Sequence, residues 1–149
     1  MKIKNLIRLI LALVLVTGFS SAWAAQTIKW SMQGDSLTLD PHAQNEGPTT
    51  QVSRQVYEAL VQRGLDMKIG PALATSWKAT DPNTWVFQLR KDAKFSDGSG
   101  MTSADVVFSI LRAKQRTSDF KEYISTVSNV EAVGDYAVKI TTSKPNPIL

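Results

Sequence analysis

The sequence predicts a mixed α+β domain built from β-hairpins and two amphipathic helices. Three patterns indicate this class: short runs in which apolar and polar residues alternate, two segments with apolar residues at helical spacing, and turn dipeptides between them. The chain has 149 residues, enough for one domain of ordinary size or for part of a larger one. Neither internal repeats nor low-complexity stretches interrupt the pattern.

The first 24 residues have the layout of a secretory signal peptide. Three basic residues precede Leu9–Phe19, an apolar core that is too short to span a bilayer. Ala22 and Ala24 place small residues at the −3 and −1 positions of a cleavage site, so we expect cleavage after Ala24. The short core disfavours the alternative, an uncleaved membrane anchor.

Charge and cysteine content exclude several classes of protein. The chain has 17 Lys+Arg; without the three in the signal peptide, 14 remain against 13 Asp+Glu. A nearly neutral domain with scattered basic residues gives no reason to expect nucleic-acid binding. The absence of cysteine excludes disulfides, thiolate metal sites and a lipid-modified cysteine after the signal. We expect a soluble periplasmic protein without a membrane anchor or cofactor.

The first part of the mature chain predicts one strand and one helix. Thr27–Met32 alternates apolar and polar residues, the period of a β-strand. A helix is expected to begin at Pro48, because the first turn has no use for the missing N–H, and to end before Gly64. Its apolar stripe consists of Val52, Val56, Ala59 and Leu60.

Two hairpins are expected in the second part. Pro71–Trp77 is interpreted as a short irregular turn of helix that leads into a hairpin with its turn at Asp81–Asn83. The return strand is Thr84–Arg90, and its buried face consists of Trp85, Phe87 and Leu89. Further on, Gly134-Asp135 separates two alternating runs, which predicts a hairpin closed by a type II′ turn.

The stretch KFSDGSGMTSADVVFSILR, residues 94–112, combines a polar loop with a helix. Asp97-Gly98 is a turn dipeptide, and Thr102 and Asp105 have the spacing of a capping box. The helix has an apolar face formed by Val106, Val107, Ile110 and Leu111. An acidic residue at the helix start would repel phosphate, and the loop has too few carboxylates for calcium. We expect this loop to stabilise the fold without binding a ligand.

These motifs also carry a family resemblance. PALATSW, then TWVFQLRKDAKFSDG and MTSADVVFSILR, resemble the signature of the family 5 extracellular solute-binding proteins, the peptide, nickel and opine receptors of ABC importers. SLTLDPH and SRQVYEALV look like that family's first loop and helix, so the resemblance covers nearly the whole mature chain. The family often has Pro at the position of Gly100 and a polar residue at that of Ala104, both of which are details of the loop and cap.

The resemblance implies a type II periplasmic-binding-protein-like fold of the peptide-binding cluster, present in part. Residues 25–47 would form the first strand and cleft loop of lobe 1, and residues 48–149 an extra α+β subdomain. The apolar ending SKPNPIL suggests that the C-terminal remainder is missing. Members of the family close two lobes over a ligand and deliver it to an inner-membrane permease. We expect such a receptor, acting as a monomer, and no enzyme.

The resemblance also implies ligand contacts at Asn45, Glu46, Gly47 and Pro48, which correspond to residues that line the family's cleft. Glu46 could meet the amino terminus of a peptide, and the helix start could meet a carboxylate. The alternative is that the segment is only a loop before a helix with an N-terminal proline. No catalytic and no metal-binding residues are predicted.

Several other functions stay open. An exported hydrolase would have to use His42, the only histidine, and the sequence has no G-x-S-x-G motif. Nothing places together a catalytic pair among Glu46, Glu58, Glu122 and Glu131. A nickel, haem or opine receptor of the same family is the nearer alternative, although one histidine and no cysteine give weak metal ligation. Core positions are expected for Trp30, Trp77 and Trp85.

Overall fold

The computed structural model describes residues 27–147, so the predicted signal peptide and its cleavage site lie outside the described part. The chain divides into two compact units, Met1–Ser31 and Met32–Leu149. In the first unit, residues 27–31 have no regular secondary structure. The second unit contains, in order, α2 (Gly47–Val56), β1 (Val61–Arg63), β2 (Ile69–Pro71), β3 (Ala74–Asp81), β4 (Thr84–Leu89), α3 (Ser103–Ala113), β5 (Val127–Ala132) and β6 (Ala137–Thr142).

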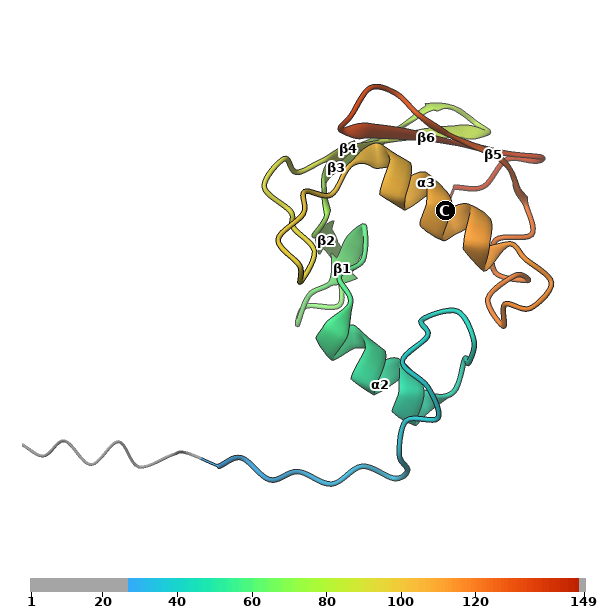
Figure 1. Cartoon of the computed structure of the whole chain (residues 1–149). Coiled ribbons are helices and arrows are strands. Elements are labelled where there is room, and N and C mark those ends of the chain that lie inside the picture. Colours follow the sequence, from blue (N-terminus) through green and yellow to red (C-terminus); the bar gives the residue numbers. More distant parts are fainter. Residues whose placement is uncertain (1–26, 148–149) are drawn as a thin grey trace, which may run out of the picture. The chain divides into compact units, whose positions relative to one another are not determined.

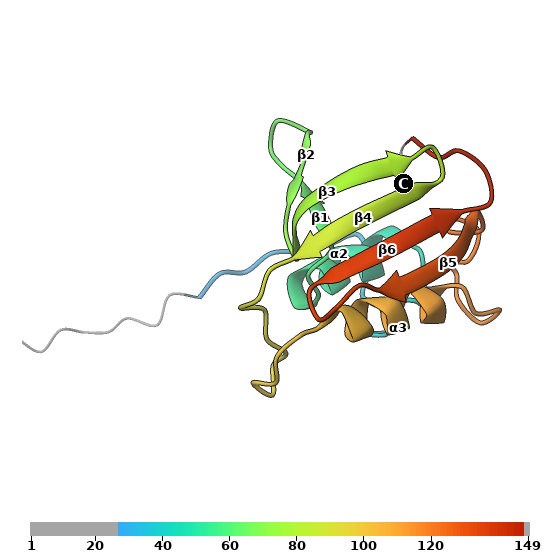
Figure 2. The same cartoon turned by 90° about the horizontal axis from the view of Figure 1, so that it is seen from above.

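The main sheet of this unit has four antiparallel strands in the order β3-β4-β6-β5 (Figure 2). Two hairpins, β3–β4 and β5–β6, meet at its centre, where Phe87 pairs with Val138 and Trp85 with Ile140. A smaller sheet consists of β1 and β2 alone. The predicted strand from residue 84 and its turn at Asp81–Asn83 are confirmed.

Helix α3 packs along one face of the main sheet, against β5 and β6 (Figure 1). The core lies between them and consists of Ala74, Phe87, Leu89, Ala93, Met101, Val106, Val127, Val130, Val138 and Ile140. Trp77 and Trp85 are half-buried and pack against this cluster. Burial of apolar area stabilises this layer at about 25 cal/mol per Å². The predicted buried face of β4 is therefore confirmed at Phe87 and Leu89, whereas Trp85 lies at its edge and is only partly buried.

The start of α3 has the predicted capping box. Asp105 Oδ2 accepts hydrogen bonds from the Thr102 N–H at 2.8 Å and from the Thr102 hydroxyl at 3.0 Å. In the preceding loop, Asp97 Oδ1 accepts from the N–H and the hydroxyl of Ser99. Both carboxylates thus stabilise local structure. The predicted apolar face is one residue too wide, since Leu111 is 47% exposed.

The β5–β6 hairpin forms at the predicted place, but four residues join its strands instead of a two-residue turn. Gly134 has a φ of 66°, a conformation that glycine adopts without steric cost. The wider loop presents carbonyl groups to α3: Gly134 O accepts from the Ser103 hydroxyl at 2.6 Å, and Asp135 O from the Ser103 N–H at 2.8 Å. These bonds satisfy donors of a buried residue at the helix start.

Two predictions for the first part of the chain are wrong. Thr27–Met32 is not a strand, and Ile28 and Trp30 are 81% and 74% exposed, so Trp30 is not a core residue. A strand needs a neighbour that accepts and donates its backbone hydrogen bonds, and no strand among residues 27–147 pairs with this segment. Sequence periodicity does not reveal whether such a neighbour exists.

The helix that begins near Pro48 is shorter than predicted, and Pro71–Trp77 is not helical. Helix α2 ends at Val56, with Tyr57 in an extended conformation at its C-cap. The carbonyls of Ala59 and Leu60 instead accept hydrogen bonds from the N–H groups of residues 73 and 74, at 3.1 and 2.8 Å. Pairing between residues distant in sequence thus overrides the helical periodicity of residues 59–60. Gly64, predicted to follow the end of the helix, lies in the β1–β2 turn.

Candidate functional site

The segment predicted to contact ligand lies at the start of α2. Glu46 is the N-cap residue, and its Oε2 accepts a hydrogen bond from the Thr49 N–H at 3.4 Å. Its second oxygen, Oε1, is buried and has no hydrogen-bond partner among the described residues. Asn45 donates from Nδ2 to the Tyr123 hydroxyl at 3.0 Å, and Gly47 is exposed. One buried carboxylate oxygen of this segment is therefore without a hydrogen-bond partner in the described residues.

A second polar cluster lies just before this segment and joins it to α3. Arg112 binds both oxygens of Asp40, with Nη1–Oδ1 at 2.7 Å and Nη2–Oδ2 at 2.6 Å. The same Nη1 lies 3.0 Å from Nδ1 of His42. We call Asp40, His42 and Arg112 the clasp. Sequence reasoning missed it, because the partners are 70 and 72 residues apart and no local pattern links a loop to a distant helix end.

The clasp shifts the pKa of each of its members. The hydrogen bond from Arg112, and then that from the His42 N–H, holds the pKa of Asp40 well below its usual 3.8. Burial, and then the charge of Arg112, lowers the pKa of His42 below 6.5. The hydrogen bond to Asp40 raises the pKa of Arg112. Asp40 and Arg112 are therefore charged and His42 is neutral at pH 7.

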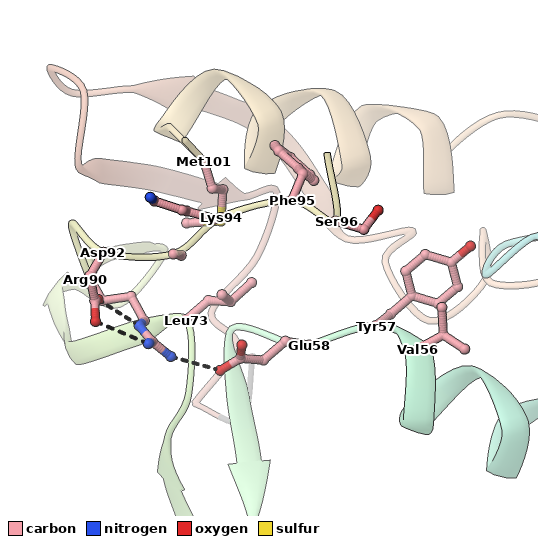
Figure 3. A pocket seen from close by; sticks show the side chains of 11 residues that line it. Val56, Tyr57, Glu58, Leu73, Arg90, Asp92, Lys94, Phe95, Ser96 and Met101 are labelled. Atoms are coloured by element: carbon pink, nitrogen blue, oxygen red, sulfur yellow. Dashed lines mark hydrogen bonds and ion pairs between the residues drawn. The ribbon is translucent and has the colours of Figure 1, made fainter. Parts of the chain in front are cut away.

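A cavity of about 550 Å³ lies beyond the end of α2, between residues 56–58 and the loop that follows β4 (Figure 3). Its charged wall is a network in which Arg90 binds Asp92 through Nε–Oδ1 at 2.8 Å and Nη2–Oδ2 at 3.1 Å, and Glu58 through Nη1–Oε1 at 3.3 Å. Half-exposed Tyr57 and Phe95 also line it. The ion pairs occupy both carboxylates, and Lys94 and Ser96 add polar groups beside the apolar and aromatic lining.

An adjoining cavity of about 340 Å³ shares part of this lining and reaches the clasp at His42. Its walls are largely apolar, with Leu60, Val106 and Ile110 among them. Among residues 27–147, no group of three or more His, Cys, Asp and Glu side chains could hold a metal ion. The geometry suits non-covalent contact with a ligand or another protein segment.

Comparison with known proteins gives the family of this chain. The model of the bacterial extracellular solute-binding proteins, family 5 Middle, matches residues 68–149. That is more than half of the chain, so this chain belongs to the family 5 solute-binding proteins. The predicted family is confirmed.

Three similar proteins illustrate the match. The periplasmic oligopeptide-binding protein OppA of Escherichia coli strain K12 is 31% identical over 141 aligned residues, which cover 82% of this chain and 26% of OppA. The solved structure of the murein tripeptide binding protein MppA of Escherichia coli has a TM-score of 0.74 and 31% identity, covering 78% of this chain and 26% of MppA. MoaA of Agrobacterium tumefaciens R10, solved with mannopinic acid, has a TM-score of 0.69 and 32% identity, covering 76% and 24%.

These likenesses confirm the predicted fold class, a partial periplasmic-binding-protein-like α+β fold. The chain spans about a quarter of the length of the relatives it matches. Within residues 27–147, no helix is both long and apolar enough to cross a membrane. The assignment of residues 25–47 and 48–149 to separate parts of the family fold stays a prediction.

Proposed function

We propose that this chain belongs to the substrate-binding component of an ABC importer and acts in the periplasm. In this proposal the receptor captures a small solute, a di- or oligopeptide, between two lobes and delivers it to an inner-membrane permease. Membership of family 5 and the likeness to receptors named for oligopeptide and murein tripeptide binding support it. The predicted signal peptide, residues 1–24, accounts for export. The receptor is not an enzyme.

The observation that carries the peptide assignment is the state of Glu46. One carboxylate oxygen caps α2, whereas Oε1 is buried without a partner in the described residues. A buried polar atom without a hydrogen bond costs about 1–3 kcal/mol, and a ligand that donates to it removes that cost. The ammonium group of a peptide is such a donor. We propose that Asn45, Glu46, Gly47 and Pro48 line the ligand cleft, with Glu46 binding the peptide amino terminus.

The neighbouring residues fit this role. Gly47 is exposed and has no side chain to obstruct a ligand, and the N-terminal end of α2 carries a partial positive charge. Asn45 is tied to Tyr123, which fixes the loop before the helix. In this proposal residues 25–47 contribute the cleft loop of the first lobe, and residues 48–149 form the α+β subdomain beside it.

The first experiment asks what the protein holds. The protein, as the cell makes it, is purified from periplasmic extract under mild conditions and examined by native mass spectrometry. We expect a bound peptide at a ratio of one to one that is released unchanged. Conversion of added peptides into products would contradict the receptor assignment and support the hydrolase alternative.

The second experiment tests Glu46 with a peptide identified in the first. Isothermal titration calorimetry compares the free peptide with its N-acetylated form on wild type, Glu46→Gln and Glu122→Gln. Glutamine keeps an oxygen for the Thr49 N–H, so the cap is retained. We expect acetylation to weaken binding by about tenfold or more in wild type and in the exposed control Glu122→Gln, but to have little effect in Glu46→Gln. Equal effects in all three proteins would exclude Glu46 as the ammonium partner.

An opine receptor is the second candidate. The solved structure of MoaA in complex with mannopinic acid has a TM-score of 0.69 to this chain, close to the value for MppA. The same calorimetric series with mannopinic acid decides between the two classes. Tighter binding of the opine than of any peptide would favour this candidate.

A further inference from the structure

We propose that Arg112 is a positioning residue for the ligand-contact segment Asn45–Pro48, and that protonation of His42 releases this segment. The clasp would make ligand capture depend on pH. The part that concerns ligand affinity rests on the proposed function, whereas the part that concerns the loop can be tested without a ligand.

The clasp fixes the loop to a rigid element. Two parallel N–H···O bonds of 2.7 and 2.6 Å join Arg112 to Asp40, an arrangement that sets orientation as well as distance. Arg112 stands in the last turn of α3, which packs on the main sheet. Two further bonds hold the same stretch: Tyr57 OH donates to Leu39 O at 2.7 Å, and the Asp119 N–H donates to His42 O at 3.0 Å.

Hydrogen bonds and the Asp40–Arg112 ion pair are especially important for holding this stretch, because almost no apolar side chain is buried in it. Leu37 and Leu39 are both mostly exposed, and Thr49 is the only buried residue between residues 27 and 57. The Ala43 N–H donates to Asp40 O at 3.3 Å, which closes a turn over residues 40–43. Only two residues then separate His42 from Asn45. A shift of Asp40 or His42 is therefore passed on to the ligand-contact segment.

His42 makes the arrangement sensitive to protons. A guanidinium group has only donors, so Nδ1 of His42 must accept from Arg112 and be unprotonated. A proton on Nδ1 removes the acceptor and places two positive charges about 3 Å apart, which costs free energy in a half-buried site.

The other charged or titratable groups near His42 come from four segments of the chain. Asp40 lies on its own loop and Arg112 on α3; Asp105 of α3, with Tyr57 and Glu58 after α2, lines the same cavity; and Asp119 binds the His42 carbonyl through its backbone. The described structure has no hydrogen bond from the ring to the carboxylate of Glu58 or Asp105. Burial and the charge of Arg112 accordingly lower the His42 pKa, in spite of the attraction of Asp40.

The clasp is expected to weaken as the pH falls. Because the pKa of His42 is lower in the folded protein than its ordinary 6.5, the unfolded or opened state binds more protons as the pH falls below 6.5. The clasp is therefore fully stabilising above pH 6.5 and weakens as the pH falls toward the lowered pKa. Asp40 stays ionised throughout this window, since its own pKa lies well below 3.8.

Hydrogen exchange of the ligand-free protein, as the cell makes it, tests the clasp directly. Protection factors for the amides of residues 36–48 are measured at about pH 7.5 and about pH 5, with the amides of β4 and β6 as an internal reference. The variants are Arg112→Gln, Arg112→Lys and His42→Gln, whose amide oxygen can accept from Arg112 but does not titrate.

We expect protection of residues 36–48 in wild type to fall by about tenfold from the higher to the lower pH, with the reference strands unchanged. Arg112→Gln should lose this protection at both pH values, and Arg112→Lys should recover part of it. His42→Gln should retain protection at both. Equal loss in His42→Gln and wild type, or unchanged protection in Arg112→Gln, would overturn the proposal.

Calorimetry with trialanine over the same pH range tests whether the state of the clasp changes the affinity for a peptide. Wild type should bind about tenfold more weakly at the lower pH, and His42→Gln should show no such change. A pH-independent affinity in a protein whose loop exchange responds to pH would overturn the positioning role but leave the receptor function standing. If trialanine does not bind, the exchange result alone decides whether the clasp exists, and the peptide assignment is the part in doubt.

Discussion

Two regions of the described chain are stabilised in different ways. Between residues 74 and 142, a four-stranded sheet and α3 enclose every apolar residue that is buried in residues 27–147. Between residues 32 and 57, the side chains of Leu37 and Leu39 are exposed, and hydrogen bonds to Arg112, Asp119 and Tyr123 hold residues 40–45.

This chain is stable in its sheet region and adjustable in the loop before α2. Apolar burial gives the sheet region cooperative packing that no single polar bond controls. The loop before α2 depends on a few charge-assisted hydrogen bonds, each of which a substitution or a proton can remove. The predicted ligand contacts lie in this second region, as expected for elements that move on binding.

Removal of a core aromatic side chain should have the largest effect. Phe87→Ala, at a side chain that is 5% exposed, is expected to lower the free energy of unfolding by about 3–5 kcal/mol because it leaves a cavity against Val138. The matched control Phe108→Ala lies on α3 at 68% exposure and should change it by less than about 0.5 kcal/mol. Urea denaturation measures both. Similar losses of unfolding free energy in the two variants would show that the sheet region is not the more stable of the two regions.

A backbone substitution in the β5–β6 loop should come next. Gly134→Ala forces a side chain onto a residue with a φ of 66° and is expected to cost about 1–2 kcal/mol. Gly100→Ala is the control, since Gly100 has no positive φ and open space around it, and should be neutral or slightly stabilising. Thermal unfolding followed by circular dichroism compares them. An unaffected melting temperature in Gly134→Ala would mean that the loop adopts another conformation.

Loss of the α3 capping box should have a smaller effect. Asp105→Ala removes the acceptor for the N–H and hydroxyl of Thr102 and is expected to cost about 1 kcal/mol. Ser109→Ala, an exposed substitution on the same helix, serves as the control. If both variants unfold at the same urea concentration, the cap contributes nothing to the stability of the sheet region.

An ion pair within the sheet should matter least. Lys139 and Glu131 face each other on β6 and β5, and the hydrogen bond from Lys139 lowers the pKa of Glu131 below 4.5. In Lys139→Gln we expect this pKa to rise toward 4.5, by NMR titration, with almost no change in unfolding temperature, because exposed pairs contribute little. Arg112→Gln should instead release residues 36–48. If Lys139→Gln and Arg112→Gln disturbed the structure equally, the sheet region and the loop before α2 would not differ in the way proposed.

Local patterns predicted the sheet region well. The strand from Thr84, its turn at Asp81–Asn83 and the capping box of α3 follow from residues within a few positions of one another, so the sequence alone was sufficient. The same reasoning failed at 27–32, 59–60 and 71–77, where a distant partner, or the lack of one, decides the conformation.

The sequence by itself determined the family, the α+β class and the position of Asn45–Pro48 at the start of a helix, because these depend on local motifs and spacing. Only the tertiary structure decided that Glu46 keeps one carboxylate oxygen without a partner, and that Arg112 of α3 holds Asp40 and His42. The physical reason is that hydrogen bonds between residues 70 positions apart depend on how the chain returns to itself, which no local pattern of side chains records.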